Sequence, residues 1–180
     1  MFKKITLGLL LGLAASALLL IMYFVLIDRW PWQHPLPWHY NLEGYQQAAS
    51  LSRQSGQPIL LLIERRRCRR CELLEQNLLK DPHLETVVGD LILVRLDISA
   101  NSATAQLAAR YGRDLKLPAL FLETEPGEKA YPLHLNPELS HIWVPGQPGT
   151  QGNKMPLSVA SLDLAIERTL QQIQPPTQSP

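Results

Sequence analysis

The sequence has few cysteines and few charged residues, and each shortage excludes a class of protein. Two cysteines are too few for a miniprotein stapled by disulfides, and they supply only half of a four-cysteine zinc site. Charged residues make up 18% of the chain and the formal net charge is +1, a balance that predicts no nucleic acid among the partners. No nucleophile-elbow motif of a serine hydrolase occurs, and Gly146-Gln147-Pro148-Gly149 predicts a turn rather than a phosphate-binding loop.

One long apolar run is present near the N-terminus, followed by enough chain for one ordinary domain. From Ile5 to Ile27 no residue is charged, and a helix of that length spans about 34 Å, enough to cross a bilayer core. The run predicts an uncleaved membrane anchor over residues 1–29, with the transmembrane helix over residues 5–27. The alternative is a cleaved signal peptide, but apolar regions of signal peptides usually extend over only about 7–15 residues.

The charges on either side of the apolar run predict its orientation. Lys3 and Lys4 precede the run, whereas Arg29 beyond it stands beside Asp28 and the next basic residue is Arg53. Positive charges favour the cytoplasmic side, so the N-terminus is expected to be cytoplasmic. In a bacterium this makes the chain a single-pass inner-membrane protein with its domain in the periplasm, where disulfides persist.

Residues 30–41 are rich in proline and aromatic residues, and two interpretations stay open. The aromatic side chains could form an interfacial belt that continues into a stiff juxtamembrane linker. Alternatively, they could pack on the domain that follows. The aromatic residues are Trp30, Trp32, Trp38 and Tyr40.

Beyond the linker, hydrophobic periodicity alternates between helices and strands, which predicts an α/β domain over residues 42–173. Nearly continuous apolar runs, such as Leu91–Leu96, are typical of strands that helices cover on both faces. Residues 136–157 are rich in proline and glycine and predict an inserted irregular loop, and residues 174–180 predict a flexible tail. The expected helices cover residues 42–54, 68–79, 82–89, 102–111 and 158–173, and the expected strands cover residues 58–64, 91–98, 117–123 and 130–135.

Both cysteines belong to one motif, Cys68-Arg69-Arg70-Cys71, at the expected start of the helix over residues 68–79. Cys71, Leu74 and Leu78 share one helical face, so Cys71 is expected to be shielded from solvent. Cys68 is expected in the exposed first turn, where unpaired backbone N–H groups and the helix dipole stabilise a thiolate. The spacing therefore predicts a redox-active disulfide in which Cys68 is the nucleophile and Cys71 the resolving cysteine.

Arginines surround this motif: Arg65, Arg66, Arg67, Arg69 and Arg70 lie within six positions. Exposed cations at a helix N-terminus oppose the dipole by about 0.3–1 kcal/mol each, which favours a functional reason for them. Arg67, Arg69 and Arg70 are predicted either to stabilise the Cys68 thiolate or to dock an acidic partner. The alternative is a solvated loop that neighbouring glutamates balance.

The order of the elements resembles the thioredoxin fold over about residues 42–173. Several motifs are similar to those of membrane-tethered and transmembrane thiol-disulfide interchange proteins of bacterial envelopes. These motifs are Gln57-Pro58-Ile59-Leu60-Leu61, the Cys-x-x-Cys-Glu-Leu-Leu-Glu helix, Asp81-Pro82, Leu107–Gly112 and Leu117-Pro118.

The resemblance implies a thioredoxin-like fold, a central mixed sheet flanked by helices, behind one N-terminal transmembrane helix. It implies thiol-disulfide oxidoreductase activity with no cofactor beyond the Cys68–Cys71 disulfide and no metal. The implied partners are protein thiol or disulfide clients or another envelope oxidoreductase. Pro118 is expected to follow a cis peptide bond and to lie against the cysteines, while the backbone of Leu117 pairs with the partner.

The sequence departs from this family at positions close to the motif. Family members usually carry Trp before the first cysteine and small residues between the two, where this chain has Arg67, Arg69 and Arg70. Classical thioredoxins also carry a buried acid six residues before the first cysteine. That position is Leu62 in this chain, so the usual proton acceptor for Cys71 is missing, and Glu64 is only a weak substitute for it.

Two other functions are compatible with the sequence. In a metal-binding module, His83, His134 or His141 would join the two cysteines, although five adjacent cations disfavour a sixth. In a non-catalytic scaffold, the arginine loop or the insertion at residues 136–157 would dock an envelope complex.

Overall fold

The computed structural model describes residue 22 and residues 36–147 and 149–173. The predicted anchor, apart from Met22, therefore lies outside the described residues, as do the first part of the linker and the tail at residues 174–180. Among the residues that are described, no helix has the length and apolar character needed to span a bilayer. Membrane attachment thus remains a prediction from the sequence.

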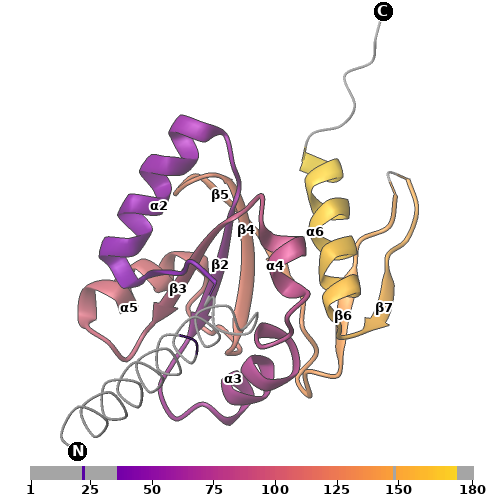
Figure 1. Ribbon diagram of the computed structural model, residues 1–180, viewed down its shortest axis with the longest axis horizontal. Helices are drawn as coiled ribbons and strands as arrows, with labels where there is room; N and C mark the ends of the chain where they lie inside the picture. The colour runs from indigo at the N-terminus through magenta and orange to yellow at the C-terminus, as the bar shows by residue number, and fades with distance from the viewer. Residues whose placement is uncertain (1–21, 23–35, 148, 174–180) are drawn as a thin grey trace, which may run out of the picture. The chain divides into compact units, whose positions relative to one another are not determined.

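The apolar runs form the centre of a five-stranded mixed sheet with the order β1-β3-β2-β4-β5 (Figure 1). β1 and β2 run parallel to β3, whereas β4 runs antiparallel to both β2 and β5. The expected α/β fold with a mixed sheet is confirmed. The strands are β1 (His39–Tyr40), β2 (Ile59–Glu64), β3 (Ile92–Asp97), β4 (Ala119–Glu125) and β5 (Lys129–Leu133).

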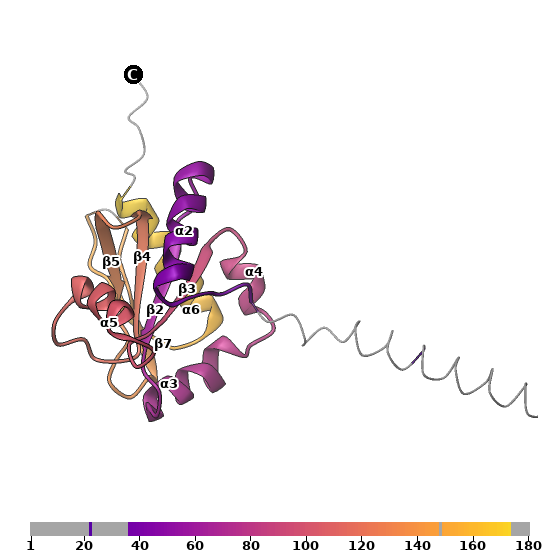
Figure 2. The ribbon, with the colours of Figure 1, turned by 90° about the vertical axis from the view of Figure 1, so that its left-hand side faces the viewer.

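Helices cover both faces of this sheet, because successive side chains of β2 point to opposite faces. Ile59, Leu61 and Ile63 pack with α2 and α5 on one face. Leu60 and Leu62 pack with α3, α4 and α6 on the other (Figures 1 and 2). The helices are α2 (Asn41–Ser55), α3 (Arg69–Leu74), α4 (Leu84–Val88), α5 (Ser102–Ala108) and α6 (Val159–Ile173); a π-helix (Glu75–Leu79) continues α3, and a 3₁₀-helix (Ala109–Tyr111) continues α5.

The insertion at residues 136–157 is not the irregular loop that its proline and glycine content predicts. It contains an antiparallel pair of strands, β6 (His141–Val144) and β7 (Asn153–Pro156). Ile142 and Val144 are buried in the core that α6 shares, whereas Trp143 between them is 46% exposed. The prediction was wrong because this short alternation of buried and exposed residues anchors the segment to the domain.

The ordered domain also begins earlier than residue 42. The side chains of Leu36 and Trp38 pack against the core, and β1 pairs with β3 through His39 and Val94. Of the two interpretations of the aromatic linker, packing on the domain therefore holds for Trp38. Tyr40, by contrast, is exposed.

Candidate functional site

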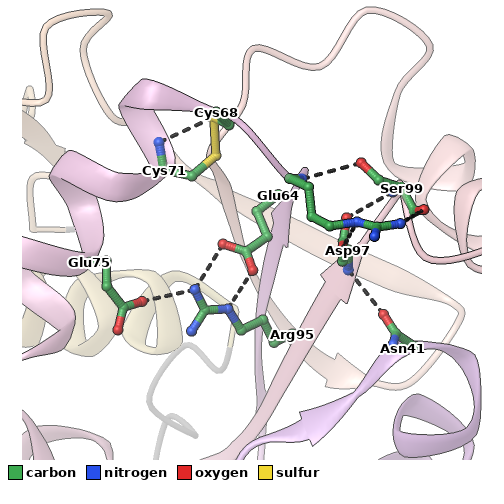
Figure 3. Close-up of polar contacts among 9 residues, drawn as sticks. Asn41, Glu64, Cys68, Cys71, Glu75, Arg95, Asp97 and Ser99 are labelled. Atoms are coloured by element: carbon green, nitrogen blue, oxygen red, sulfur yellow. Dashed lines mark hydrogen bonds and ion pairs between the residues drawn. A yellow bond between two sulfur atoms is a disulfide. The ribbon is translucent and has the colours of Figure 1, made fainter.

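The Cys-x-x-Cys motif lies at the start of α3, where a short loop from β2 enters the helix (Figure 3). A disulfide joins Cys68 and Cys71, whose Cα atoms are 5.2 Å apart. Cys68 is the N-cap residue, and its Sγ accepts a hydrogen bond of 3.1 Å from the backbone N–H of Cys71. After reduction, the same N–H is placed to stabilise a thiolate on Cys68.

The expected contrast in exposure between the two cysteines is absent from the disulfide form. Cys68 is 8% exposed and Cys71 is 6% exposed. The prediction that Cys68 is exposed was wrong, because at the N-cap its sulfur packs against the first turn of α3. Cys71, Leu74 and Leu78 are all buried, as their spacing predicts. Hydrogen bonding rather than exposed area therefore distinguishes the two sulfurs.

Both cysteines line a cavity of about 260 Å³ whose other walls are charged. The carboxylates come from the ends of β2 and β3 and from α3 and the π-helix, and the guanidinium groups from β3 and the loop before α3. The disulfide therefore borders a cavity whose other lining residues all carry a charged group. The charged lining residues are Glu64, Arg65, Arg66, Arg67, Glu72, Glu75, Arg95 and Asp97.

Arg95 ties two of these carboxylates together beneath the disulfide (Figure 3). Its guanidinium donates to Glu64 at 2.5 Å and to Glu75 at 2.8 Å, and it lies 6.0 Å from the centre of the Trp38 ring. Burial by itself would lower the pKa of Arg95, but the hydrogen bonds and charges of Glu64 and Glu75 raise it above its ordinary value. Sequence reasoning missed this ion-pair network. The sequence feature that could have revealed it is Arg95 itself, a charged residue inside the apolar run that forms β3.

The acid of classical thioredoxins has no counterpart at Leu62, whose side chain is fully buried in the apolar core. Glu64 lies two residues further along β2, and its side chain lines the same cavity as the cysteines. Its carboxylate is engaged by Arg95, so it enters the site as half of an ion pair. Any proton acceptor for Cys71 from this strand is therefore a charge-paired carboxylate.

The five arginines around the motif have different environments. Arg66 donates to the carbonyl of Ser99 at 2.6 Å and lies 3.5 Å from the carboxylate of Asp97. Arg70 is half-buried and donates to the carbonyl of Asn136, so it links α3 to the base of the inserted hairpin. Arg65, Arg67 and Arg69 are exposed. Arg66 is exposed as well, so four of the five arginines face solvent, and Arg66 and Arg70 are the two that also bond to other segments of the chain.

The Leu117–Pro118 peptide bond is cis, which is the isomer that the resemblance implies. Pro118 is buried, and the pairing of Ala119 with Ile63 places it beside the end of β2, from which the cysteine loop departs. Within the part of the chain that the structure describes, neither Leu117 nor Pro118 lines the charged cavity. Their predicted roles in shaping the site and pairing with a partner remain predictions.

A second buried polar cluster lies at the opposite end of the sheet. Glu123 on β4 pairs with Ile59 at the start of β2 and is 1% exposed. It accepts hydrogen bonds from the hydroxyls of Tyr111 at 2.8 Å and Tyr45 at 3.2 Å. Burial raises the pKa of Glu123, although these hydrogen bonds oppose the change. This cluster is separate from the disulfide, and sequence reasoning did not find it.

The histidines that could complete a metal site are His83, His134 and His141. Over residues 36–147 and 149–173, no group of three His, Cys, Asp or Glu side chains is placed to hold a metal ion. His141 instead has its Nδ1 atom 2.9 Å from the hydroxyl of Ser140. The two cysteines are bonded to each other.

The part of the chain that contains the disulfide matches a known protein family. The family model described as thioredoxin-like matches residues 40–124, which include β2, β3, most of β4, the Cys-x-x-Cys motif and the cis proline. Residues 40–124 have the thioredoxin-like fold. Their redox-active group is the disulfide itself, so this domain needs no separate cofactor. No curated protein matches the sequence.

Solved structures similar to this chain include a thioredoxin, a domain of DsbD and the DsbH oxidoreductase. A thioredoxin from Thermus thermophilus is 16% identical, over 77% of this chain and 87% of that chain, with a TM-score of 0.42. The reduced C-terminal domain of Neisseria meningitidis DsbD is 17% identical, over 52% and 84% of the two chains, with a TM-score of 0.42. The DsbH oxidoreductase is 22% identical, over 50% and 67%, with a TM-score of 0.42.

Proposed function

We propose that the protein is a membrane-tethered periplasmic thiol-disulfide oxidoreductase that exchanges disulfides with envelope proteins through Cys68 and Cys71. The observation that carries this proposal is the disulfide between the N-cap and the first turn of α3 in a thioredoxin-like domain. Attachment to the inner membrane rests on the uncharged run from Ile5 to Ile27 and on Lys3 and Lys4 before it.

The two cysteines act in sequence when the reduced protein meets a client disulfide. The Cys68 thiolate attacks one client sulfur, forms a mixed disulfide and expels the other client sulfur as a thiolate. The Cys71 thiolate then attacks the Cys68 sulfur, which releases the second client thiolate and restores the Cys68–Cys71 disulfide. Two electrons pass from the protein to the client. The reverse sequence oxidises a client dithiol.

The first step depends on a stabilised Cys68 thiolate, and two features of the site supply one. The backbone N–H of Cys71 points at the Cys68 sulfur, and exposed arginines stand on both sides of that residue. Stabilising the thiolate also stabilises the reduced form, so both features favour a more oxidising couple. The carboxylate of Glu64 would oppose them, but Arg95 balances its charge.

Equilibration of the full-length protein in detergent with glutathione buffers tests the proposal. An exchanging disulfide should open and close in one two-electron transition with a midpoint above about −300 mV, the range below which structural disulfides lie. Alkylation of the thiols followed by gel mobility reports the reduced fraction. Cys68→Ser and Cys71→Ser should each abolish the transition. A disulfide that stays closed throughout the glutathione range would contradict the proposal.

A non-catalytic docking role is the second candidate. The exposed Trp143 on the inserted hairpin favours it, because a large apolar side chain on a protruding strand is typical of protein-binding surfaces. In that case a variant with both cysteines replaced by serine would retain its function in cells. The exchange function predicts that the same variant is inactive.

A further inference from the structure

Three exposed arginines surround the disulfide, and we refer to Arg65, Arg67 and Arg69 together as the arginine rim. Arg65 and Arg67 line the cavity beside the cysteines, and Arg69 directly follows Cys68. Among the described residues, no carboxylate lies within 4.0 Å of any of the three guanidinium groups. The rim is thus a cluster of cations that form no ion pair with the described residues.

The carboxylates of the cavity are already engaged. Glu64 and Glu75 are held by Arg95, and Asp97 is close to Arg66. Glu72 is the remaining acid of the lining. The surface next to the disulfide therefore presents more unpaired positive than negative charge, and a partner that approaches the disulfide meets this field first.

Local stability alone does not account for the rim. Arg67 has φ of 56°, a left-handed conformation that favours glycine over a long side chain. The cations also lie at the N-terminal end of α3, where they oppose the helix dipole. Residues that break local preferences in this way are concentrated at functional sites.

We propose that the arginine rim selects clients in which acidic residues flank the reactive cysteine. The proposal rests on the exchange function above and names its client class. Guanidinium groups bind carboxylates with paired hydrogen bonds, and an exposed cationic patch speeds the approach of an acidic segment. Aspartate or glutamate within two or three residues of the client cysteine would reach the rim while the client sulfur meets Cys68.

Matched peptide disulfides test this preference with the reduced full-length protein. The peptides share one sequence except for the two residues on each side of the cysteine, which are all glutamate, all glutamine or all lysine. At low ionic strength we expect the glutamate peptide to react about tenfold faster than the lysine peptide, with glutamine between them. The difference should shrink at 0.5 M salt, because salt screens exposed charges. Division by each peptide's rate with dithiothreitol removes its intrinsic reactivity.

Variants of the rim separate docking from thiolate chemistry. Replacing Arg65, Arg67 and Arg69 by glutamine changes the reactivity of the Cys68 thiolate equally toward every peptide. The ratio of the glutamate-peptide rate to the lysine-peptide rate therefore changes only if these arginines dock the peptide. We expect that ratio to fall to within about threefold of unity. If the triple variant does not fold, each single replacement should lower the ratio by about twofold. Arg53→Gln, an exposed arginine at the far end of α2, should leave the ratio unchanged.

The outcomes distinguish the two proposals. Equal corrected rates for the three peptides would overturn the acidic preference while leaving the exchange function intact. A ratio that survives the rim replacements would overturn the role of these arginines. Failure to react with any peptide would contradict the exchange function, and the client preference would fall with it.

Discussion

Glu123 is a carboxyl group enclosed at the end of the sheet remote from the disulfide. Burial raises the pKa of Glu123 above its ordinary value of 4.5, against the hydrogen bonds from Tyr111 and Tyr45. A raised pKa means that the folded protein holds this proton more tightly than the unfolded chain does. The resulting stabilisation is fully present below pH 4.5 and is lost as the pH rises through the higher pKa of the folded state.

Replacing Glu123 by glutamine should remove this pH dependence. In urea denaturation, the difference in free energy of unfolding between the natural protein and Glu123→Gln should decrease from pH 4 to pH 7. The exposed Glu125→Gln on the same strand is the control, and its difference should stay nearly constant. Parallel stability profiles for the natural protein and Glu123→Gln would show that burial does not shift this carboxyl.

At the residue scale, the sequence predicts the positions of functional groups better than their partners. The Cys-x-x-Cys spacing placed both sulfurs at a helix start, where the structure has them. Arg95 and Glu123 lie in otherwise apolar strands, which signals that each needs a partner. Glu64 is 31 residues from Arg95 and Tyr45 is 78 residues from Glu123, and no local pattern identifies contacts over such separations.

At the element scale, the inserted hairpin is a packed part of the domain. Ile142 on β6 is fully buried against the core that includes α6, and its neighbour Trp143 is largely exposed. We expect Ile142→Ala to lower the free energy of unfolding by about 2–4 kcal/mol because it leaves a cavity in this core. Trp143→Ala should cost less than about 1 kcal/mol. Urea denaturation of the two variants measures both, and equal small losses would show that the hairpin is not packed.

The remaining elements followed from hydrophobic periodicity to within a few residues, and the exceptions have physical reasons. β1 is only two residues long, too short for any alternation to be read from the sequence. The hairpin was hidden by the surrounding prolines and glycines, although Ile142, Trp143 and Val144 form a short strand-like run. The expected helix over residues 68–79 divides into α3 and a π-helix, and Glu75 at the junction binds Arg95.

At the scale of the whole molecule, the proposed membrane anchor would determine which proteins the disulfide can meet. The apolar run at residues 5–27 and the lysines before it predict a cytoplasmic N-terminus and a periplasmic domain. A reporter fused after Pro180 should therefore be active when it requires the periplasm and inactive when it requires the cytoplasm. The protein should also remain in the membrane at full length after high-salt washing. Cytoplasmic reporter activity, or a shortened soluble product, would contradict this topology.

The central claim is that Cys68 attacks client disulfides and Cys71 releases the clients. The most direct test is to capture mixed disulfides in cells with single-cysteine variants. Cys71→Ala should accumulate mixed disulfides through Cys68, because the second step is blocked after the first has occurred. Cys68→Ala should capture far less, since it lacks the N-cap sulfur to which the Cys71 N–H donates. If neither variant captures a partner, or if both capture equally, the proposed division of roles between the two cysteines is wrong.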